Sequence, residues 1–334
     1  MRHVGEAVGV VVATTEAIAH DALEAIAVDY EDLPVAACPE DAIAPGAPQL
    51  HANIPANVCY EGETGDEAAT AAAFARAHHV SRLTVRSDRV VGNPMEPRAC
   101  LASFDAASGV YHVHVPSQGV IPMRRQLAGL VGVEEHQVRV EVNDVGGSFG
   151  IRSAPYPEYV VAMIAAKRLG RPVKWVGSRS ECFLTDVQGR AIVISGELAL
   201  DRDGRFLASR YEFLIDLGAY QSFTGAMSST NNSAQCAVGV YATPVTYGRT
   251  KLVMTNTVPM AAYRGAGRPD IAYAIERLVD HAAREMGIDP AEMRRRNHVL
   301  PSDMPYKAAS GSVYDCGNFP AILDKALELS DWAN

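Results

Sequence analysis

Two glycine-rich segments contain the residue types that could do chemistry in this sequence. The first glycine loop, residues 144–150, reads Asp-Val-Gly-Gly-Ser-Phe-Gly between an expected strand and an expected helix. Its glycines let the backbone approach a ligand closely and direct N–H groups at it. It lacks the lysine of a P-loop and the glycine spacing of a dinucleotide fingerprint. A tight turn between packed elements is the competing interpretation. Phe149 favours a ligand-facing loop, because an aromatic side chain in a glycine turn usually contacts another group.

The second glycine loop, residues 262–269, reads Ala-Tyr-Arg-Gly-Ala-Gly-Arg-Pro and also precedes an expected helix. The free N–H groups and the positive dipole end of a helix N-terminus suit an anion. The alternative is a helix-entry loop in which Arg264 or Arg268 pairs with a nearby carboxylate.

Two shorter segments add polar groups at bends in the chain. Gln118 follows the expected strand at residues 111–115, and side chains at strand ends often reach a cleft; an ordinary polar turn is the alternative. Residues 93–98, Asn-Pro-Met-Glu-Pro-Arg, form a rigid bend because two prolines fix the backbone. A structural salt bridge is the role we expect for Glu96.

The composition narrows the classes of partner. The 334 residues carry 30 Lys and Arg against 39 Asp and Glu, a formal charge of -9, without a basic block that would bind nucleic acid. No apolar run is long enough to span a bilayer. The six cysteines form no C-x-x-C pair, so they indicate reduced thiols of a cytoplasmic protein and neither zinc nor iron–sulfur ligands.

The elements that must position these loops are mixed. Residues 7–13 predict a strand, residues 16–27 a helix and residues 28–31 a second short strand. The proline-rich residues 33–63 predict a surface linker, with a domain boundary near residue 60.

Beyond that boundary, strands and helices interleave without the regular spacing of a doubly wound sheet, which predicts a mixed α+β fold. The Asp203-Gly204 pair predicts a hairpin between two long strands. The expected strands are residues 80–85, 99–104, 110–115, 137–142, 192–200 and 206–215. The expected helices are residues 121–130, 159–169, 271–286, 290–296 and 319–329. Gly170 is expected to close the helix at residues 159–169 in left-handed geometry.

Several segments, taken in order, resemble the molybdopterin-binding large subunits of the xanthine dehydrogenase, aldehyde oxidase and aerobic carbon monoxide dehydrogenase family. The order and spacing of the segments are far more specific than any one glycine loop. They are Val4-Gly5-Glu6, residues 93–98, Ser117-Gln118, residues 146–150, Gly170-Arg171-Pro172-Val173-Lys174-Trp175, residues 262–269 and residues 294–297.

This resemblance implies oxidative hydroxylation of an aldehyde or an N-heterocycle, with water as the oxygen donor. The implied cofactor is molybdenum on a molybdopterin, often as the cytosine dinucleotide in bacteria. The implied partners are an iron–sulfur subunit and an FAD subunit, which carry the electrons away, and the complete enzyme is expected to be a dimer of heterotrimers. No side chain of the chain is expected to ligate the metal.

The resemblance also implies roles for individual residues. Gln118 would hydrogen-bond the apical oxygen ligand of the metal. The backbone of the first glycine loop would line the dithiolene, with Phe149 against the substrate, and the second loop would flank the metal. The expected cofactor-binding residues are Gln118, Gly147, Ser148, Phe149, Gly150, Tyr263, Arg264 and Gly265, of which Gln118, Phe149 and Arg264 are the expected catalytic residues.

Two departures from the family bear on the substrate. Carbon monoxide dehydrogenases carry a copper-binding cysteine after the arginine of the second loop, whereas this sequence has Gly265, which argues against CO oxidation. Purine hydroxylases carry a glutamate shortly after the first loop, where this sequence reads Ile151-Arg152-Ser153-Ala154.

The resemblance further implies an incomplete chain. Residues 1–60 are expected to be the end of a hammerhead-like α/β domain plus a linker, residues 61–300 the first molybdenum-cofactor domain, and residues 301–334 the start of a following segment. The catalytic glutamate of the family is expected beyond residue 334, so we expect the isolated chain to be inactive.

Two other functions remain open on the sequence. One is a cofactor-free assembly or scaffolding remnant of such an enzyme. The other is a nucleotide-dependent oxidoreductase, which the missing fingerprint glycines and acidic ribose partner disfavour.

Overall fold

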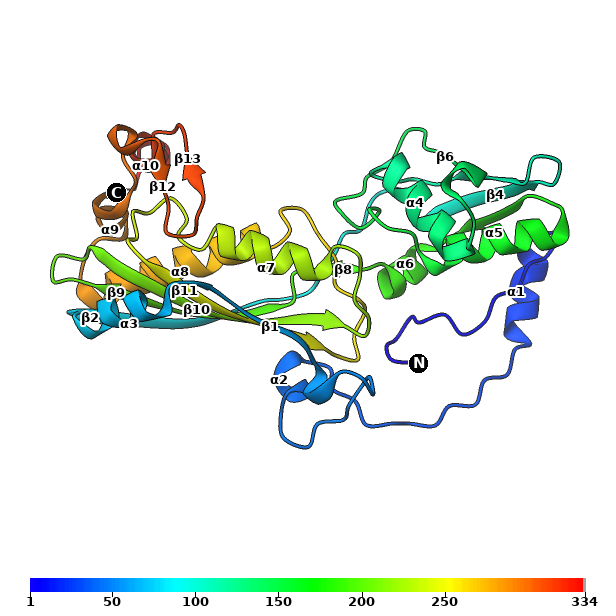
Figure 1. Ribbon diagram of the computed structural model, residues 1–334, viewed down its shortest axis with the longest axis horizontal. Coiled ribbons are helices and arrows are strands. Elements are labelled where there is room, and N and C mark those ends of the chain that lie inside the picture. The colour runs from blue at the N-terminus through cyan, green and yellow to red at the C-terminus, as the bar shows by residue number, and fades with distance from the viewer. Residues whose placement is uncertain (333–334) are drawn as a thin grey trace.

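The computed structural model describes residues 1–332, and two lobes, each built on its own β-sheet, make up most of the molecule (Figure 1). The large-sheet lobe contains a five-stranded sheet, and the small-sheet lobe contains a four-stranded one. Helices from distant parts of the sequence cover both sheets. This arrangement confirms the predicted mixed α+β class.

The sheet of the large-sheet lobe has the strand order β1-β11-β10-β9-β2. The pair β10 and β11 is parallel, and the other neighbouring pairs are antiparallel. Only β9 and β10 are joined by a tight turn, so the rest of the sheet depends on pairing between distant segments. The strands are β1 (Val58–Gly65), β2 (His79–Ser87), β9 (Ile192–Leu200), β10 (Phe206–Gly218) and β11 (Thr246–Met254).

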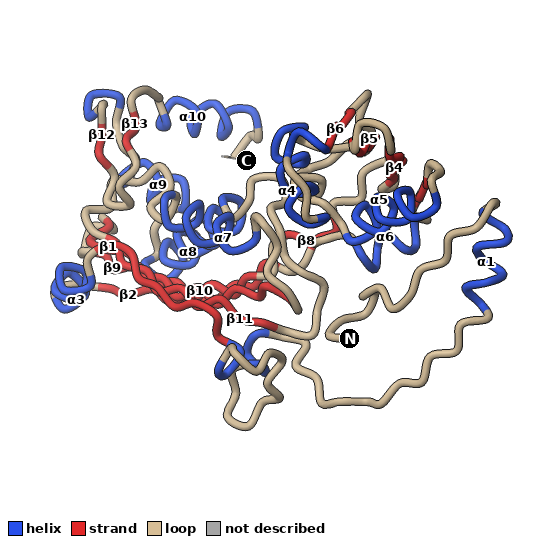
Figure 2. Tube along the Cα trace, turned by 45° about the vertical axis from the view of Figure 1, so that its right-hand side comes forward, coloured by secondary structure: helices blue, strands red, loops and turns tan. Residues whose placement is uncertain are grey.

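Both faces of this sheet are covered by helices. On β11, Leu252 belongs to the core shared with α8 (Arg268–Met286), whereas the next residue, Val253, packs against α2 (Pro39–Ala42). Successive side chains of a strand point to opposite faces, so α8 and α2 lie on opposite sides. Figure 2 shows α8 and α7 (Gly225–Gln235) along one face of the sheet. Helix α3 (Glu67–Ala75) packs through Ala73 on the face opposite α8.

The small-sheet lobe has the strand order β6-β5-β4-β7. Its core is formed by apolar side chains of the strands and of α4 (Val120–Val131) and α5 (Pro157–Leu169), which cover the sheet. Helix α5 ends at Gly170, whose φ of 62° is left-handed, and this confirms the predicted glycine cap. The strands are β4 (Ala99–Asp105), β5 (Val110–His114), β6 (Val138–Glu141) and β7 (Val173–Val176).

The chain crosses between the lobes along two short strands that pair with each other. Val90 and Val91 of β3 (Val90–Val91) face Gly189 and Gln188 of β8 (Gln188–Gly189). Gln188 also forms a parallel bridge with Met260, at the approach to the second glycine loop. Helix α6 (Arg179–Thr185) immediately precedes β8. The second glycine loop therefore lies beside this junction.

Two predictions for the N-terminal segment are wrong. Residues 7–13 and 28–31 form no strand, although α1 (Glu16–Glu24) begins where the sequence predicts a helix. Valines 8, 10 and 12 are exposed, and within the described residues no neighbouring strand pairs with this backbone. A strand needs a partner for its N–H and C=O groups, so periodicity alone does not form one.

The predicted linker at residues 33–63 is also partly wrong. Its last residues belong to β1, which pairs with β11 because Val58 and the following residues reach the free edge of the sheet. The remainder is irregular apart from α2 and a single turn, η1 (Pro55–Asn57).

The C-terminal elements follow α8 closely. They are α9 (Pro290–Asn297), η3 (Pro301–Asp303), β12 (Tyr306–Lys307), β13 (Val313–Tyr314) and α10 (Phe319–Leu329). Helices α8, α9 and α10 confirm the three predicted C-terminal helices. One further turn, η2 (Glu135–Gln137), precedes β6. Within the described residues, no helix is long and apolar enough to cross a membrane.

Candidate cofactor site

The first glycine loop follows β6 and adopts a backbone that glycine favours. Gly147 and Gly150 have φ values of 105° and 111°, and Phe149 between them has a φ of 56°. L-residues with side chains rarely adopt this left-handed region, so the loop holds Phe149 in a strained conformation. Such strain in a loop between regular elements is frequent at ligand sites.

A row of backbone donors runs along this loop. Within the described residues, the N–H groups of Gly147, Ser148, Phe149 and Gly150 have no protein acceptor. The residues of the loop are half-buried to exposed, so the loop is not enclosed by the protein and a ligand can approach it. An acceptor-rich or anionic group would satisfy them.

Gln118 lies directly against the first glycine loop. Its Oε1 accepts a hydrogen bond of 2.6 Å from the Ser148 hydroxyl and one of 3.3 Å from the Ser153 hydroxyl. With that oxygen occupied, the Nε2 of Gln118 has no acceptor within the described part of the chain. The amide therefore has a donor available to a ligand. Ser153 was not predicted as a site residue.

The second glycine loop packs onto the first. The N–H of Arg264 donates to the carbonyl of Phe149 over 2.8 Å, and the guanidinium carbon of Arg264 lies 4.9 Å from the centre of the Phe149 ring. Gly150 contacts the same loop so closely that a Cβ there would lie 2.2 Å from the carbonyl oxygen of Ala262. Gln118, Phe149 and Arg264 thus lie around one pair of touching loops.

Tyr263 is held by a residue that the sequence analysis missed. The guanidinium carbon of Arg190 lies 5.2 Å from the centre of the Tyr263 ring, and its Nη2 donates to the carbonyl of Arg264 over 3.0 Å. Arg190 also forms an ion pair of 3.4 Å with the buried Asp270. The only sequence signal is a Gly-Arg pair before a strand, which is too common to indicate a site.

This arrangement bears on the anion site expected at the start of α8. Asp270 already places a carboxylate in the first turn of that helix, and Ser87 donates to it. The dipole of α8 is therefore complemented by a residue of the protein. The arginine that pairs with a carboxylate at this loop is Arg190, whereas Arg264 stacks on Phe149 and Arg268 donates to the Gly265 carbonyl.

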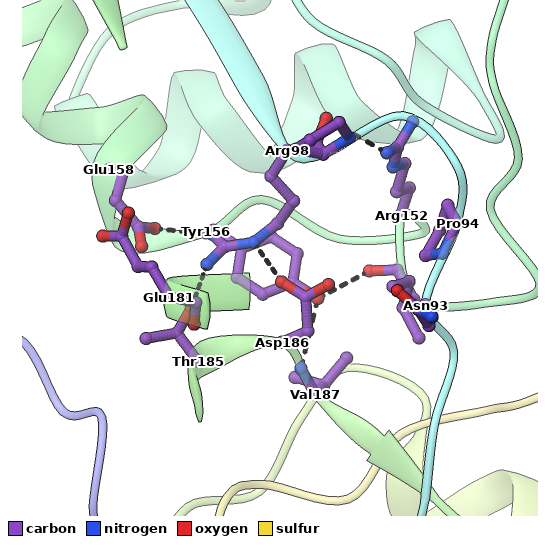
Figure 3. A network of polar contacts seen from close by, with 12 residues as sticks. Asn93, Pro94, Arg98, Arg152, Tyr156, Glu158, Glu181, Thr185, Asp186 and Val187 are labelled. Atoms are coloured by element: carbon purple, nitrogen blue, oxygen red, sulfur yellow. Dashed lines mark hydrogen bonds and ion pairs between the residues drawn. The ribbon is translucent and has the colours of Figure 1, made fainter. Parts of the chain in front are cut away.

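The bend at residues 93–98 contributes Glu96 and Arg98 to three ion pairs, each of which includes a buried arginine. Glu96 pairs with Arg152, whose Nη1 lies 2.5 Å from its carboxylate, and this confirms the predicted structural salt bridge. At the other end of the bend, Arg98 contacts Asp186 and lies 2.9 Å from Glu158 (Figure 3). Its guanidinium carbon is 3.9 Å from the centre of the Tyr156 ring. Burial raises the pKa of Asp186, and the charge of Arg98 opposes that rise.

The groups that converge on the two loops fit the cofactor implied by the resemblance. They are four backbone N–H groups, one amide and the Arg264 guanidinium, all of them donors. A pterin with its dithiolene and phosphate groups presents acceptors and negative charge, which this set complements. Within residues 1–332, no cluster of three or more His, Cys, Asp or Glu side chains could hold a metal ion.

Known proteins resemble this chain over most of its length. The family model of the molybdopterin cofactor-binding domain matches residues 50–298. The carbon monoxide dehydrogenase large chain of Hydrogenophaga pseudoflava is 34% identical over 97% of this chain. The nicotine 6-hydroxylase large subunit of Paenarthrobacter nicotinovorans is 33% identical over 99% of it. The chain spans 42% and 40% of the length of these two relatives.

A solved structure extends the likeness to the fold. Quinoline 2-oxidoreductase from Pseudomonas putida 86 superimposes with a TM-score of 0.90 at 32% identity, over 96% of this chain and 41% of that one. The chain belongs to the family of molybdopterin-binding large subunits that includes carbon monoxide dehydrogenase, xanthine dehydrogenase and aldehyde oxidoreductase.

Proposed function

We propose that this chain forms part of a molybdenum hydroxylase, which oxidises an aldehyde or an N-heterocycle with water as the oxygen donor. One observation carries the proposal. Within a chain matched by the cofactor-binding family, the free N–H groups of residues 147–150 lie beside Gln118 and Arg264. These donors come from three segments distant in sequence, and an acceptor-rich ligand explains why they meet.

When bound, the molybdenum–pterin group supplies a two-electron oxidation coupled to oxygen transfer from water. The chain binds and orients that group through the N–H row of the first glycine loop and through the Gln118 amide. Tyr263, Arg264 and Gly265 flank it from the second loop. Phe149, with 37% of its surface exposed, presents an apolar ring to the substrate.

The residues around the loops support the substrate class. Gly265 carries no thiolate, which disfavours a copper-dependent oxidation of CO despite the 34% identity to a carbon monoxide dehydrogenase. Residues 151–154 carry no glutamate with which to bind a purine. Other relatives are named for the oxidation of nicotine, of quinoline and of an aldehyde, which favours an N-heterocycle or an aldehyde.

The finer parts of the proposal follow the family. The cofactor is the cytosine dinucleotide form of molybdopterin, and an iron–sulfur subunit and an FAD subunit accept the electrons. The complete enzyme is a cytoplasmic dimer of heterotrimers. The division of the chain near residues 60 and 300 remains a prediction of the same kind.

Analysis of the purified complex that carries this chain tests the proposal. Molybdenum is measured by mass spectrometry, pterin by the fluorescence of its oxidised derivative, and turnover by dye reduction with benzaldehyde and with quinoline. The proposal expects stoichiometric molybdenum and pterin, with substrate-dependent reduction when the electron-accepting subunits are present. Protein that contains neither metal nor pterin would support a cofactor-free remnant. Nucleotide binding by calorimetry in that protein would support a nucleotide-dependent oxidoreductase.

A further inference from the structure

The bend at residues 93–98 and the first glycine loop are joined by reciprocal hydrogen bonds. The N–H of Glu96 donates to the Gly146 carbonyl over 3.2 Å, and the N–H of Gly146 donates to the Glu96 carboxylate over 2.8 Å. A Cβ at Gly146 would lie 2.4 Å from the Cβ of Glu96, so the two backbones meet without space for a side chain. The start of the glycine loop is therefore tied to Glu96.

The buried side chain of Arg152 stabilises this contact between Glu96 and Gly146. Its Nη1 lies 2.5 Å from the same oxygen of Glu96 that accepts from Gly146. Its Nη2 donates to the Glu96 carbonyl and, over 3.3 Å, to the Pro97 carbonyl. Only 1% of Arg152 is exposed. A planar guanidinium fixes several acceptors at once, so the carboxylate of Glu96 cannot turn away from Gly146.

The backbone of Arg152 holds the other end of the loop. Its N–H donates to the Ser148 hydroxyl over 3.3 Å, and that hydroxyl donates to Gln118. Its carbonyl accepts from the N–H of Gln118 over 3.2 Å. One residue thus connects both sides of the site, reaching Gly146 through its side chain and Ser148 and Gln118 through its backbone.

From these contacts we propose that Arg152 and Glu96 are positioning residues for the cofactor. Together they set the direction of the N–H row at residues 147–150 relative to the Gln118 amide. The inference rests on the proposed function, because it assigns these residues to the geometry of a bound molybdenum–pterin group. Neither side chain needs to touch that group, since each acts through Gly146, Ser148 or Gln118.

Arg98 provides a matched control. It belongs to the same bend and is also only 1% exposed, but its guanidinium contacts Asp186, Glu158 and Thr185 and forms no hydrogen bond with Glu96 or with the glycine loop (Figure 3). Its link to the loop is indirect, across the Tyr156 ring, whose hydroxyl donates to the Ile151 carbonyl. Replacing either buried arginine by lysine keeps the charge and removes the planar set of donors. Any general loss of stability should therefore be similar in Arg98→Lys and Arg152→Lys.

The experiment compares the holoenzyme that carries this chain with its Arg152→Lys, Arg152→Met, Glu96→Gln and Arg98→Lys variants. Molybdenum and pterin content, the electron paramagnetic resonance spectrum of the partly reduced metal, kcat and KM are measured for each. Changing groups that support a metal site typically costs about 10–100-fold in affinity or activity. We expect a loss of that size in kcat per molybdenum for Arg152→Met, with an altered spectrum and little change in KM.

The more conservative variants show which groups of Arg152 and Glu96 affect kcat and the spectrum. Arg152→Lys should recover part of the kcat that Arg152→Met loses, because lysine still pairs with Glu96 but cannot hold the Pro97 carbonyl as well. Glu96→Gln should shift the spectrum although its amide oxygen still accepts from Gly146. If Arg152→Met does not fold, the spectrum of Glu96→Gln provides the test instead. Arg98→Lys should keep the wild-type spectrum and kcat.

Opposite results separate this inference from the proposed function. A wild-type spectrum and wild-type kcat per molybdenum in the Arg152 and Glu96 variants would overturn the positioning role alone. The same would follow if Arg98→Lys changed the spectrum as much as Arg152→Lys. A wild-type protein without molybdenum and pterin would instead overturn the proposed function, and the positioning role with it.

Discussion

Arg264 contacts Phe149 twice, through its backbone N–H at 2.8 Å and through its guanidinium, whose carbon lies 4.9 Å from the ring centre. These two residues belong to different glycine loops and to different lobes. The backbone bond fixes the spacing of the loops, and the stacked guanidinium covers one face of a ring held at a φ of 56°. The contact thus joins the two halves of the candidate site.

A double-mutant cycle should detect this contact. Phe149→Leu and Arg264→Met each remove one side of the cation–π pair, and the double variant removes both. Unfolding in urea gives the change in the free energy of unfolding for each of the three variants. We expect a coupling of about 0.5–1 kcal/mol, the range for such pairs at exposed sites. The pair of Arg210 and Phe74, at 4.7 Å on the large sheet, serves as a positive control. A coupling within error of zero would show that the stack contributes nothing.

The close approach of the loops predicts a strong effect for Gly150→Ala. The new Cβ would lie 2.2 Å from the Ala262 carbonyl oxygen at a φ of 111°, so the loops must separate. Backbone strain and overpacking together should lower the free energy of unfolding by about 3 kcal/mol or more, and cofactor content should fall. Gly170→Ala is the control, because its φ of 62° is strained but the space around it is open. Equal losses in the two variants would contradict the packing argument.

Local signals in the sequence predicted the elements that local contacts form. The Asp203-Gly204 turn indicated the hairpin of β9 and β10, and Gly170 marked the end of α5. Helix α7 was missed because its Ser- and Asn-rich sequence is typical of a loop. It is helical in a setting where Ser228, Ser229 and Ser233 are buried, with Gly267 packed against Ser228. Strand β11 was missed because β1 is far from it in the chain, and the preceding strand, β10, is separated from it by α7.

The candidate site shows the same difference between residues that local sequence indicates and residues that tertiary contacts bring in. Gln118 and both glycine loops were predicted from the order of motifs, and the structure places them in contact. Arg190 and Ser153 were missed because each takes part only through tertiary contacts, with Tyr263 and with Gln118. A sequence pattern identifies a segment that can approach a ligand, whereas the residues that hold that segment depend on the packing of distant elements.

His298 should make stability depend on pH. It is 7% exposed and stacks on Tyr241 at 5.6 Å between ring centres, and burial lowers its pKa below the usual 6.5. As the pH falls through 6.5, the unfolded chain binds the proton first, so the free energy of unfolding should decrease until His298 also titrates in the folded state.

Urea unfolding at about pH 7.5 and about pH 5.5, on either side of the usual histidine pKa, measures the effect of His298. His298→Gln should lose less stability than the wild type between these two conditions. His20→Gln should behave like the wild type, because His20 lies on α1 with 70% of its side chain exposed. A wild-type pH dependence in His298→Gln would rule out this origin.

The backbone conformation at residue 265 should prevent copper binding even when Gly265 is replaced by cysteine. Its φ is 96°, and a Cβ there would lie 2.5 Å and 2.6 Å from the Cγ and Cδ of Pro269, a ring that cannot move aside as a flexible side chain would. The wild-type holoenzyme should therefore contain no stoichiometric copper and should reduce no dye with CO, since it has no thiolate at this position to hold a soft Cu(I) ion. Gly265→Cys and Gly265→Ser introduce the same backbone strain and the same contact with Pro269, so both should lose similar stability, and neither should retain copper after dialysis. Copper retained by the cysteine variant alone, together with CO-dependent turnover, would show that the second glycine loop can accept a side chain at residue 265 after all.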